Sequence, residues 1–308
     1  MSNVAALPAD RCLSEPTAPT VQALPALHTD LGGLPIRRLL PRSQRRMVGP
    51  WCFCDLYGPL AAAMDVPPHP HTGLQTVSWL LEGAVRHDDS LGATALARPG
   101  RLNLMTAGRG IAHAERTPPG AAARLHGVQL WIALPDAHRH VAPAFEAHEA
   151  VPEAAFEGGS ARVIIGALAG VSSPARAFSP VVGAELALRG GRAELPLDRG
   201  FEHALLVLSG GAALDGRHLE ADTLYYLGAG RATLCLEAEG AGARLLLLGG
   251  APFREPVLMW WNFVARTGEE LREARADWEA GRRFGTVAAD AGRRLAAPPF
   301  VARPVPRS

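Results

Sequence analysis

The chain has 308 residues, which is enough for two ordinary domains, and its hydrophobic fraction of 48% and charged fraction of 20% are typical of a globular protein. Its 31 basic and 30 acidic residues leave a formal net charge of +1, which argues against a protein that binds nucleic acid through charge. The longest apolar runs are far too short to cross a bilayer, so no membrane partner is expected either.

The cysteine content indicates the cellular compartment. The four cysteines are Cys12, Cys52, Cys54 and Cys235, and the pair at 52 and 54 lacks the Cys-x-x-Cys spacing of redox motifs. Few cysteines and no secretory signal predict a reducing, cytoplasmic setting in which all four are free thiols.

The first half of the chain predicts an all-β domain. Residues 1–32 are rich in Ala, Pro, Thr and Ser without any period, and we expect them to form a poorly ordered leader. Short apolar segments then recur at regular spacing with turns between them, which is typical of a barrel or sandwich. The expected strands cover 34–40, 47–57, 74–82, 85–88, 93–97, 102–106, 112–116 and 125–134.

Several side chains on these strands have more than one possible interpretation. The aromatic residues Trp51 and Phe53 are expected in the core rather than against a cofactor. His126 and Gln129 fall on opposite faces of the strand 125–134, because the side-chain period of a strand is two. One of the two is a candidate to line a pocket, and core or surface positions remain alternatives for both.

The second half repeats the pattern of the first. Residues 135–160, with His138, His140 and His148, are expected to be a linker between domains without a metal role. The strands expected after it cover 161–167, 181–188, 192–196, 203–208, 211–214, 218–220, 223–227, 231–236 and 244–248. We therefore expect an N-terminal domain over 33–150 and a C-terminal domain over 151–308. The second domain has only His203 and His218 on its strands and no His-x-His pair, so no metal site is expected there.

One helix is expected near 267–281, within the C-terminal domain. Thr267 can cap it, with Glu270 three residues later, and Gly281 stands where a helix ends. Leu271, Ala274 and Trp278 fall near one face and should pack on a barrel. The Arg- and Pro-rich residues 293–308 are expected to be a tail.

Two pairs of polar residues within 67–115 predict a metal site. His69 and His71 are two residues apart, as are His113 and Glu115, so on extended segments each pair points to one face. Two neighbouring strands would then present three imidazoles and one carboxylate. Imidazole suits Fe, Ni, Cu and Zn, and an added carboxylate favours Fe or Mn. Four ligands on an octahedral metal leave two open positions, as a catalytic metal needs.

The alternative interpretation is that these histidines are ordinary surface or core residues that bind no metal. A single His-x-His pair is common on surfaces and in cores, so it is weak evidence for a metal. Two such pairs in strand context, separated by about one β-hairpin, favour the metal site. Gly108 and Gly110 support it, because they permit the tight turn or positive φ that leads the chain back into a strand before His113.

These motifs resemble the pirin family, whose members are bicupins with one metal site in the N-terminal domain. The resemblance is carried by His69-Pro-His-x-Gly-x-x-Thr-Val, by Leu-Leu-Glu-Gly at 80–83 and, most specifically, by Met-Thr-Ala-Gly-Arg-Gly-Ile-x-His-x-Glu at 105–115. Further similar segments lie at 45–55, 129–135, 249–256 and 281–285. The resemblance thus covers most of the chain from about Ile36 to Gly285.

The resemblance implies a fold and a ligand set. It implies two tandem cupin domains, which are jelly-roll β-barrels, with the metal ligands His69, His71, His113 and Glu115, and Glu115 is also the candidate catalytic base. This chain departs from the family at Gln75, where many members have Glu. We expect metal binding to be retained, with the metal's affinity or potential altered by the loss of a negative charge near the site.

The resemblance also implies a function. Some bacterial pirins cleave flavonols such as quercetin with dioxygen, so a small aromatic substrate, O2 and one divalent metal are expected. Fe(II) is the first choice, and Ni, Mn, Cu and Zn are alternatives. Other pirins act as metal- and redox-sensing regulatory proteins that bind a protein partner, and the same four ligands would serve that role. The resemblance favours a monomer.

Overall fold

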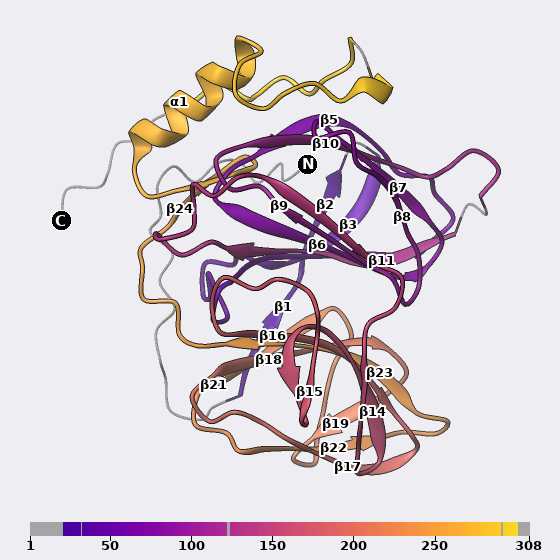
Figure 1. The fold of residues 1–308 in the computed structure, drawn as a ribbon. Helices are drawn as coiled ribbons and strands as arrows, with labels where there is room; N and C mark the ends of the chain where they lie inside the picture. The colour runs from indigo at the N-terminus through magenta and orange to yellow at the C-terminus, as the bar shows by residue number, and fades with distance from the viewer. Residues whose placement is uncertain (1–20, 32, 122–123, 291, 301–308) are drawn as a thin grey trace.

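The protein is built from two β-barrels stacked face to face. The computed structural model describes residues 21–31, 33–121, 124–290 and 292–300, and Figure 1 shows the two barrels one above the other, with a single α-helix at the outer end of the first. This arrangement confirms the predicted all-β fold of two barrels with a short C-terminal helix. In the described part of the chain, no helix has the length and apolar character needed to span a bilayer.

The first barrel combines a seven-stranded and a four-stranded sheet. The larger sheet has the order β12-β9-β6-β11-β4-β3-β2, and the smaller has the order β5-β10-β7-β8. The strands are β2 (Leu27–Leu31), β3 (Leu34–Leu40), β4 (Trp51–Leu60), β5 (Asp65–His71), β6 (Leu74–Glu82), β7 (Val85–Asp89), β8 (Thr94–Ala97), β9 (Leu102–Thr106), β10 (Ile111–Arg116), β11 (Leu125–Ala133) and β12 (Ala144–His148).

The second barrel repeats this plan. Its large sheet has the order β1-β21-β18-β23-β16-β14-β13, with β15 paired to β14, and its small sheet has the order β17-β22-β19-β20. The strands are β1 (Gln22–Pro25), β13 (Glu153–Phe156), β14 (Gly159–Leu168), β15 (Val171–Ser172), β16 (Val181–Leu188), β17 (Gly191–Pro196), β18 (Glu202–Ser209), β19 (Ala212–Leu214), β20 (Arg217–His218), β21 (Thr223–Gly228), β22 (Thr233–Ala238) and β23 (Ala243–Gly250).

The prediction of a poorly ordered leader is wrong for residues 22–31, which contain two strands, β1 and β2. β1 adds to the second barrel by pairing antiparallel with β21, and β2 pairs with β3 in the first barrel. Leu24 is buried in the core between the barrels. The order of β1 comes from a strand about 200 residues further along the chain, which no local period of the sequence can show. Residues 1–20 of the expected leader lie outside the described residues.

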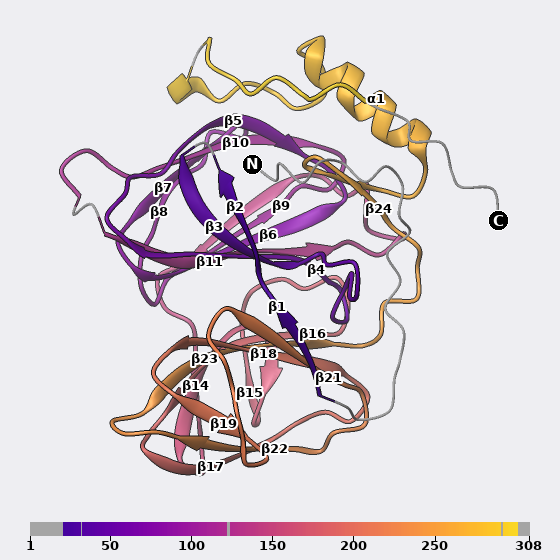
Figure 2. The same cartoon turned by 180° about the vertical axis from the view of Figure 1, so that it is seen from behind.

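The C-terminal segment crosses back to the first barrel. The hairpin β24 (Leu258–Trp260) and β25 (Phe263–Ala265), the helix α1 (Gly268–Glu279) and the short 3-10 turn η1 (Ala288–Asp290) lie on the outer side of β5 and β10 (Figure 2). The sequence placed the helix in the C-terminal domain, but its buried residues Leu271, Ala274 and Trp278 pack in one cluster with Ala112 and Ala114 of β10. Of the expected tail, Arg293 pairs with Asp65 of the first barrel.

The helix itself begins and ends where the sequence predicts. Thr267 is the N-cap residue, and its hydroxyl oxygen accepts a hydrogen bond from the Glu270 N–H at 3.2 Å. Gly281 has a φ of +68°, which is the left-handed conformation that ends many helices.

The largest core cluster of the protein lies between the two barrels. It joins residues of both large sheets, among them Trp51, Trp79, Leu206 and Leu246. Trp51 is fully buried, and its indole N–H lies 3.1 Å from the carbonyl oxygen of Val182 and 3.0 Å from that of Gly249. This confirms that Trp51 is a core residue, and it shows that the core in question belongs to both domains at once.

The strand β5 carries His69 and His71, for which the sequence predicts an extended segment without giving its bounds. Its prolines at 67, 68 and 70 lack the backbone N–H that a central strand needs. The structure accommodates them because β5 is the edge strand of its sheet and pairs only with β10 within that sheet.

Candidate metal centre

Three histidines converge inside the first barrel. His69 and His71 point to one face of β5, and His113 of β10 stands directly opposite His69 in the strand register. The ring centroids of the three lie 4.3 to 5.1 Å apart, and their ligand atoms all fall within 4.8 Å of one another. Within residues 21–31, 33–121, 124–290 and 292–300, this is the one group of three or more His, Cys, Asp or Glu side chains with such geometry.

The turn before His113 depends on glycine. Gly108 has a φ of +51°, and a Cβ atom there would lie 2.1 Å from the carbonyl oxygen of Val141. The conformation and the close approach both exclude larger residues, as the sequence predicts for this turn. The turn therefore brings β10 back alongside β5 and sets the register that places His113 opposite His69.

The hydrogen bonds of these imidazoles leave one nitrogen of each directed to the common centre. His69 Nδ1 donates to the Pro67 carbonyl at 2.9 Å, and His71 Nδ1 donates to the Asn262 carbonyl at 3.0 Å, since a carbonyl can only accept. The lone pair of each ring is then on Nε2. Nε2 of His113 is buried and has no hydrogen-bond partner among the described residues. Three histidines whose ligand atoms lie within 4.8 Å of one another in one buried place fit a transition metal.

Burial keeps the three rings neutral. It lowers the pKa of His69 to about 3 and the pKa values of His71 and His113 well below their usual range. A neutral imidazole offers the lone pair that a metal ligand needs, so protonation does not compete with a metal at neutral pH.

Glu115 lies in the same barrel but not in the three-histidine group. A bulge in the β5–β10 register falls between His113 and Glu115. The Glu115 carboxylate is close to Ser78, with Oε1 3.2 Å from the Ser78 hydroxyl oxygen. Burial raises the pKa of this carboxyl group. The ligand role expected for Glu115 stays a prediction.

A row of polar side chains crosses the inner face of the large sheet near Glu115. Asn103, Ser78 and Gln129 are direct neighbours on β9, β6 and β11, so their side chains share a face. Ser78 Oγ lies 2.9 Å from Gln129 Oε1, and the amide atoms of Asn103 are buried without a partner among the described residues. Of the two candidates on β11, it is therefore Gln129 that lines the interior near the site.

Two stacked aromatic rings form an apolar wall beside the histidines. Phe53 and Trp131 stack with ring centroids 4.0 Å apart, and the edge of Trp131 meets His71 at 5.1 Å. Phe53 is buried in a core cluster, as expected, but that cluster lies on the metal-site side of β4. The interior next to the histidines thus combines a flat aromatic wall with a polar row.

Gln75 does not lie near the histidines, contrary to the expectation. Its side chain points to the second barrel, where its amide N–H groups donate to Thr106 Oγ1 and to the Arg176 carbonyl, both at 3.0 Å. Ser78 is three residues further along β6 and points to the opposite face, into the first barrel. The difference from Glu at this position therefore changes the contact between the barrels rather than the charge around the histidines.

His87 and Asp89 of β7 were not singled out by sequence reasoning. His87 Nδ1 lies 3.2 Å from His113 Nδ1, and His87 Nε2 lies 3.1 Å from an Asp89 carboxylate oxygen. The His87 ring also stacks on Phe145 of β12 at 4.2 Å. The signal was present as another His-x-acid pair on a strand, but only the pairing of β7 with β10 places it beside His113.

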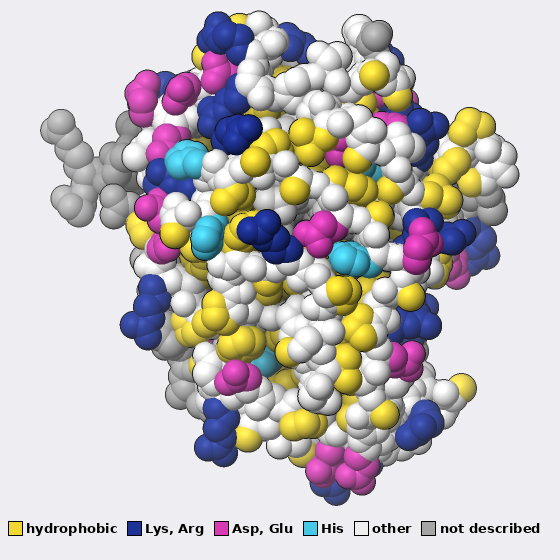
Figure 3. Space-filling view, in the orientation of Figure 1, with side chains coloured by type: hydrophobic (Ala, Val, Ile, Leu, Met, Phe, Trp, Pro, Cys, Tyr) yellow, Lys and Arg dark blue, Asp and Glu magenta, His cyan; other side chains and the backbone are white. Residues whose placement is uncertain are grey.

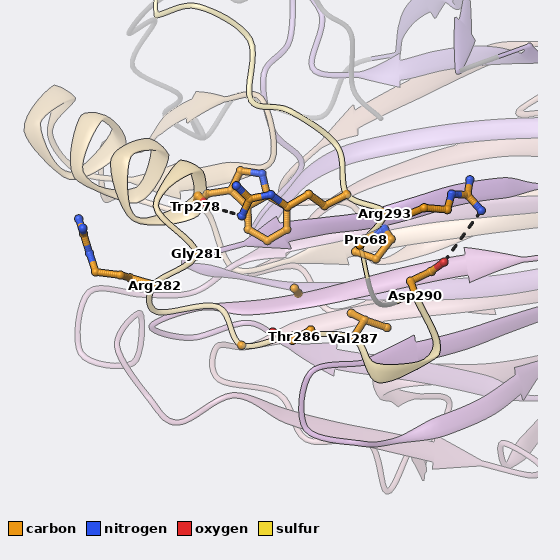
Figure 4. A pocket seen from close by; sticks show the side chains of 12 residues that line it. Pro68, Trp278, Gly281, Arg282, Thr286, Val287, Asp290 and Arg293 are labelled. Atoms are coloured by element: carbon orange, nitrogen blue, oxygen red, sulfur yellow. Dashed lines mark hydrogen bonds and ion pairs between the residues drawn. The ribbon is translucent and has the colours of Figure 1, made fainter.

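A pocket of about 200 Å³ lies on the outer side of β5, under the C-terminal segment (Figure 4). Pro68 lines it and therefore points away from the interior that the neighbouring His69 faces. Two of its charged side chains are paired, Arg282 with Asp277 and Arg293 with Asp65, each at 2.9 Å. This pocket is separated from the three histidines by the small sheet.

The second barrel has a pocket of its own, of about 450 Å³, lined in part by Asp198, Phe201 and His203. His203 is 1% exposed, and burial lowers its pKa to about 4, with a smaller opposing effect of the Asp198 charge and a further lowering effect of Arg231. Among the described residues, His203 is not part of any group of three or more His, Cys, Asp or Glu side chains that could hold a metal.

His203 should make the second barrel sensitive to acid. The unfolded chain takes up a proton at this residue below about pH 6.5, but the folded protein only below about pH 4, so its contribution to stability is lost as the pH falls through this window. The loss amounts to roughly 3 kcal/mol. We expect the stability difference between His203→Gln and the parent, measured by urea unfolding, to shift by that amount in favour of the variant from pH 7 to pH 4. His218→Gln, at an exposed site, is the control, and equal pH profiles for all three proteins would contradict the prediction.

The chain is similar in sequence to proteins of one family. The family model described as Pirin matches residues 33–132, and the one described as Pirin C-terminal cupin domain matches residues 184–285. A putative quercetin 2,3-dioxygenase from Pseudomonas aeruginosa is 47% identical over 275 residues, which cover 87% of this chain and 87% of that protein. A pirin-like protein from Caulobacter vibrioides is 36% identical over 269 residues, which cover 83% of this chain and 92% of that protein.

The structural comparison agrees with these matches. The crystal structure of a quercetin 2,3-dioxygenase from Acinetobacter baumannii superposes with a TM-score of 0.87 at 40% identity. The superposition covers 92% of this chain and 97% of that one, so the similarity extends over both barrels.

Proposed function

Because the chain belongs to the pirin family, with its two barrels as tandem cupin domains, we propose that it is a metal-dependent dioxygenase that cleaves flavonol-type substrates such as quercetin. The observation that carries the proposal is the buried group His69, His71 and His113, whose free nitrogens converge inside the first barrel. The relatives named as quercetin 2,3-dioxygenases, at 47% and 40% identity, support the choice of substrate class.

The proposed cofactor is one divalent transition metal, with Fe(II) first and Ni, Mn, Cu or Zn as alternatives. His69, His71 and His113 would hold it through Nε2, and Glu115 is the proposed fourth ligand. When bound, such a metal would supply a Lewis acid for a substrate hydroxyl group, and Fe, Ni, Mn or Cu, unlike Zn, would also supply redox chemistry for the reaction with dioxygen. The barrel contributes a site from which water is largely excluded, since the three histidines are at most 4% exposed.

Glu115 is the proposed catalytic base. A flavonol must lose the proton of its hydroxyl group before dioxygen attacks, and a buried carboxylate inside the same barrel can take it up on Oε1 or Oε2. The Ser78 hydroxyl has a single proton, which it can donate to Glu115 Oε1 at 3.2 Å or to Gln129 Oε1 at 2.9 Å. Burial raises the pKa of the Tyr57 hydroxyl well above its usual value, and the nearby charge of Glu115 raises it further. Tyr57 therefore stays a neutral hydroxyl.

The interior surface suits a flat, hydroxylated molecule. The Phe53–Trp131 stack offers an aromatic face next to His71. The buried amide of Asn103 has donor and acceptor atoms without partners among the described residues, and a substrate with several hydroxyl or carbonyl groups would satisfy them. A substrate of this kind would therefore give the Asn103 amide the hydrogen-bond partners that it lacks among the described residues.

Elemental analysis combined with quercetin turnover tests the proposal. We expect close to one transition metal ion per chain and an oxygen-dependent loss of the flavonol absorbance, with no loss under anaerobic conditions. Metal without turnover would contradict the dioxygenase and support the second role open to this family, a metal- and redox-sensing regulatory protein that binds a protein partner. Absence of metal from protein supplied with Fe(II) or Ni(II) would contradict the metal centre itself.

The remaining expectations about partners are part of the same proposal. We propose a monomer in the cytoplasm that acts on a small aromatic molecule and O2. On the face shown in Figure 3, arginine and acidic side chains are interspersed among uncharged ones, so that face presents no extended patch of positive charge to nucleic acid.

A further inference from the structure

A chain of three polar side chains extends from the metal centre to a buried carboxylate. It runs from His113 through His87 to Asp89, with contacts of 3.2 Å between the two Nδ1 atoms and 3.1 Å between His87 Nε2 and Asp89 Oδ2. His87 and Asp89 are 4% and 3% exposed, so water does not replace these contacts. The three residues come from two neighbouring strands, β10 and β7, whose register places His113 opposite Asp89.

The direction of each hydrogen bond follows from the carboxylate. A carboxylate oxygen only accepts, so His87 Nε2 must donate its proton to Asp89. In a neutral imidazole the other nitrogen then has the lone pair, so His87 Nδ1 accepts. The atom that faces it is His113 Nδ1, which must therefore donate. His113 is left with its lone pair on Nε2, the atom that is buried without a partner and that a metal needs.

The position of each member is held by further contacts. Oδ1 of Asp89 accepts from the backbone N–H groups of Leu91 and Ala93 at 2.9 and 3.0 Å, so the carboxylate cannot rotate freely. The His87 ring lies parallel to Phe145, with an angle of 13° between the planes. The two backbone-fixed ligands His69 and His71 need no such device, because carbonyl groups already hold their rings.

We infer that His87 and Asp89 are positioning residues for the metal, which act by holding His113 in the tautomer that presents Nε2 to the centre. Neither residue touches the metal or the substrate in this role. The inference rests on the proposed metal-dependent function. It adds to that function two residues, His87 and Asp89, that would increase the affinity for the metal. An outer partner of a metal-ligating histidine typically contributes 10- to 100-fold in metal affinity.

Asp89→Asn tests the inference because it should reverse the donor and acceptor roles of the hydrogen bonds that link residue 89, His87 and His113. The two backbone N–H groups at Leu91 and Ala93 require an oxygen, so the asparagine NH2 group must face His87. His87 Nε2 then accepts, His87 Nδ1 donates, and His113 has its proton on Nε2. We expect Ni(II) affinity, measured by competition with a chromophoric chelator, to fall about 10- to 100-fold.

The tautomers themselves can be observed without any metal. Histidine 15N NMR of the metal-free protein at neutral pH should show Nε2–H for His87 and Nδ1–H for His113, and the reverse for both in Asp89→Asn. His87→Phe, which keeps the ring stack on Phe145 but removes the acceptor, should weaken Ni(II) binding as well. Asp88→Asn is the matched control, because Asp88 is equally buried on β7 but bonds to Arg86 and Thr94 instead, and Ni(II) affinity should not change.

These measurements separate the inference from the proposed function. Unchanged tautomers and unchanged Ni(II) affinity in Asp89→Asn would overturn the positioning role even if the protein cleaves quercetin. A protein that shows the expected tautomers and their reversal but no quercetin turnover would support the positioning role and contradict the dioxygenase.

Discussion

Replacing His113 by alanine is expected to abolish both metal binding and turnover. His113 is the proposed ligand from β10 and stands opposite His69, so its loss removes one of three converging nitrogens and leaves the other two on a single strand. The fall in metal affinity should exceed the roughly 100-fold that an outer partner contributes, because a direct ligand is removed. Elemental analysis and oxygen-dependent quercetin loss, measured on the same preparation, provide the test.

His126→Ala is the matched control for this experiment. His126 is also a buried histidine of the first barrel, but it lies on β11 outside the three-histidine group. Its replacement should leave the metal content unchanged. Full turnover in His113→Ala, or equal metal loss in both variants, would contradict the assignment of the centre.

Replacing Trp51 by alanine is expected to destabilise the protein by about 3 to 5 kcal/mol and to uncouple its two barrels. The indole is fully buried between the large sheets and donates toward the carbonyl groups of Val182 and Gly249 in the second barrel. The opposite wall has adapted to it, because a Cβ atom at Gly183 would lie 2.8 Å from the Trp51 ring. The cavity left by alanine therefore cannot close without a shift of β16.

Calorimetry distinguishes this effect from a general loss of stability. With the interface weakened, the two barrels should unfold in separate transitions, where the parent unfolds in one. Trp278→Ala is the control, since that tryptophan is also buried but packs between α1 and the first barrel. It should lower the transition temperature without splitting the transition. A single transition in Trp51→Ala, with a cost below about 1 kcal/mol, would contradict the role of Trp51.

Much of the architecture could be predicted from local sequence. Alternating apolar residues and regular turns were enough for the strands of both barrels, and the helix 268–279 has its cap and its buried face within fifteen residues of chain. Two His-x-acid or His-x-His pairs were enough to suggest a ligand set, because a spacing of two on a strand always selects one face. The structure brings His69, His71 and His113 together, while it places Glu115 next to Ser78.

What the sequence determined by itself is therefore whatever depends on neighbours along the chain: the strand periodicity, the capped helix, the glycine turn before His113 and the identity of the histidines. The tertiary structure alone decided which side of β6 Gln75 faces, which barrel receives β1 and α1, and that His87 and Asp89 stand behind His113. These features depend on the register between strands that are far apart in sequence. A shift of one residue in that register would send every side chain to the opposite face, and no local pattern records which register is adopted.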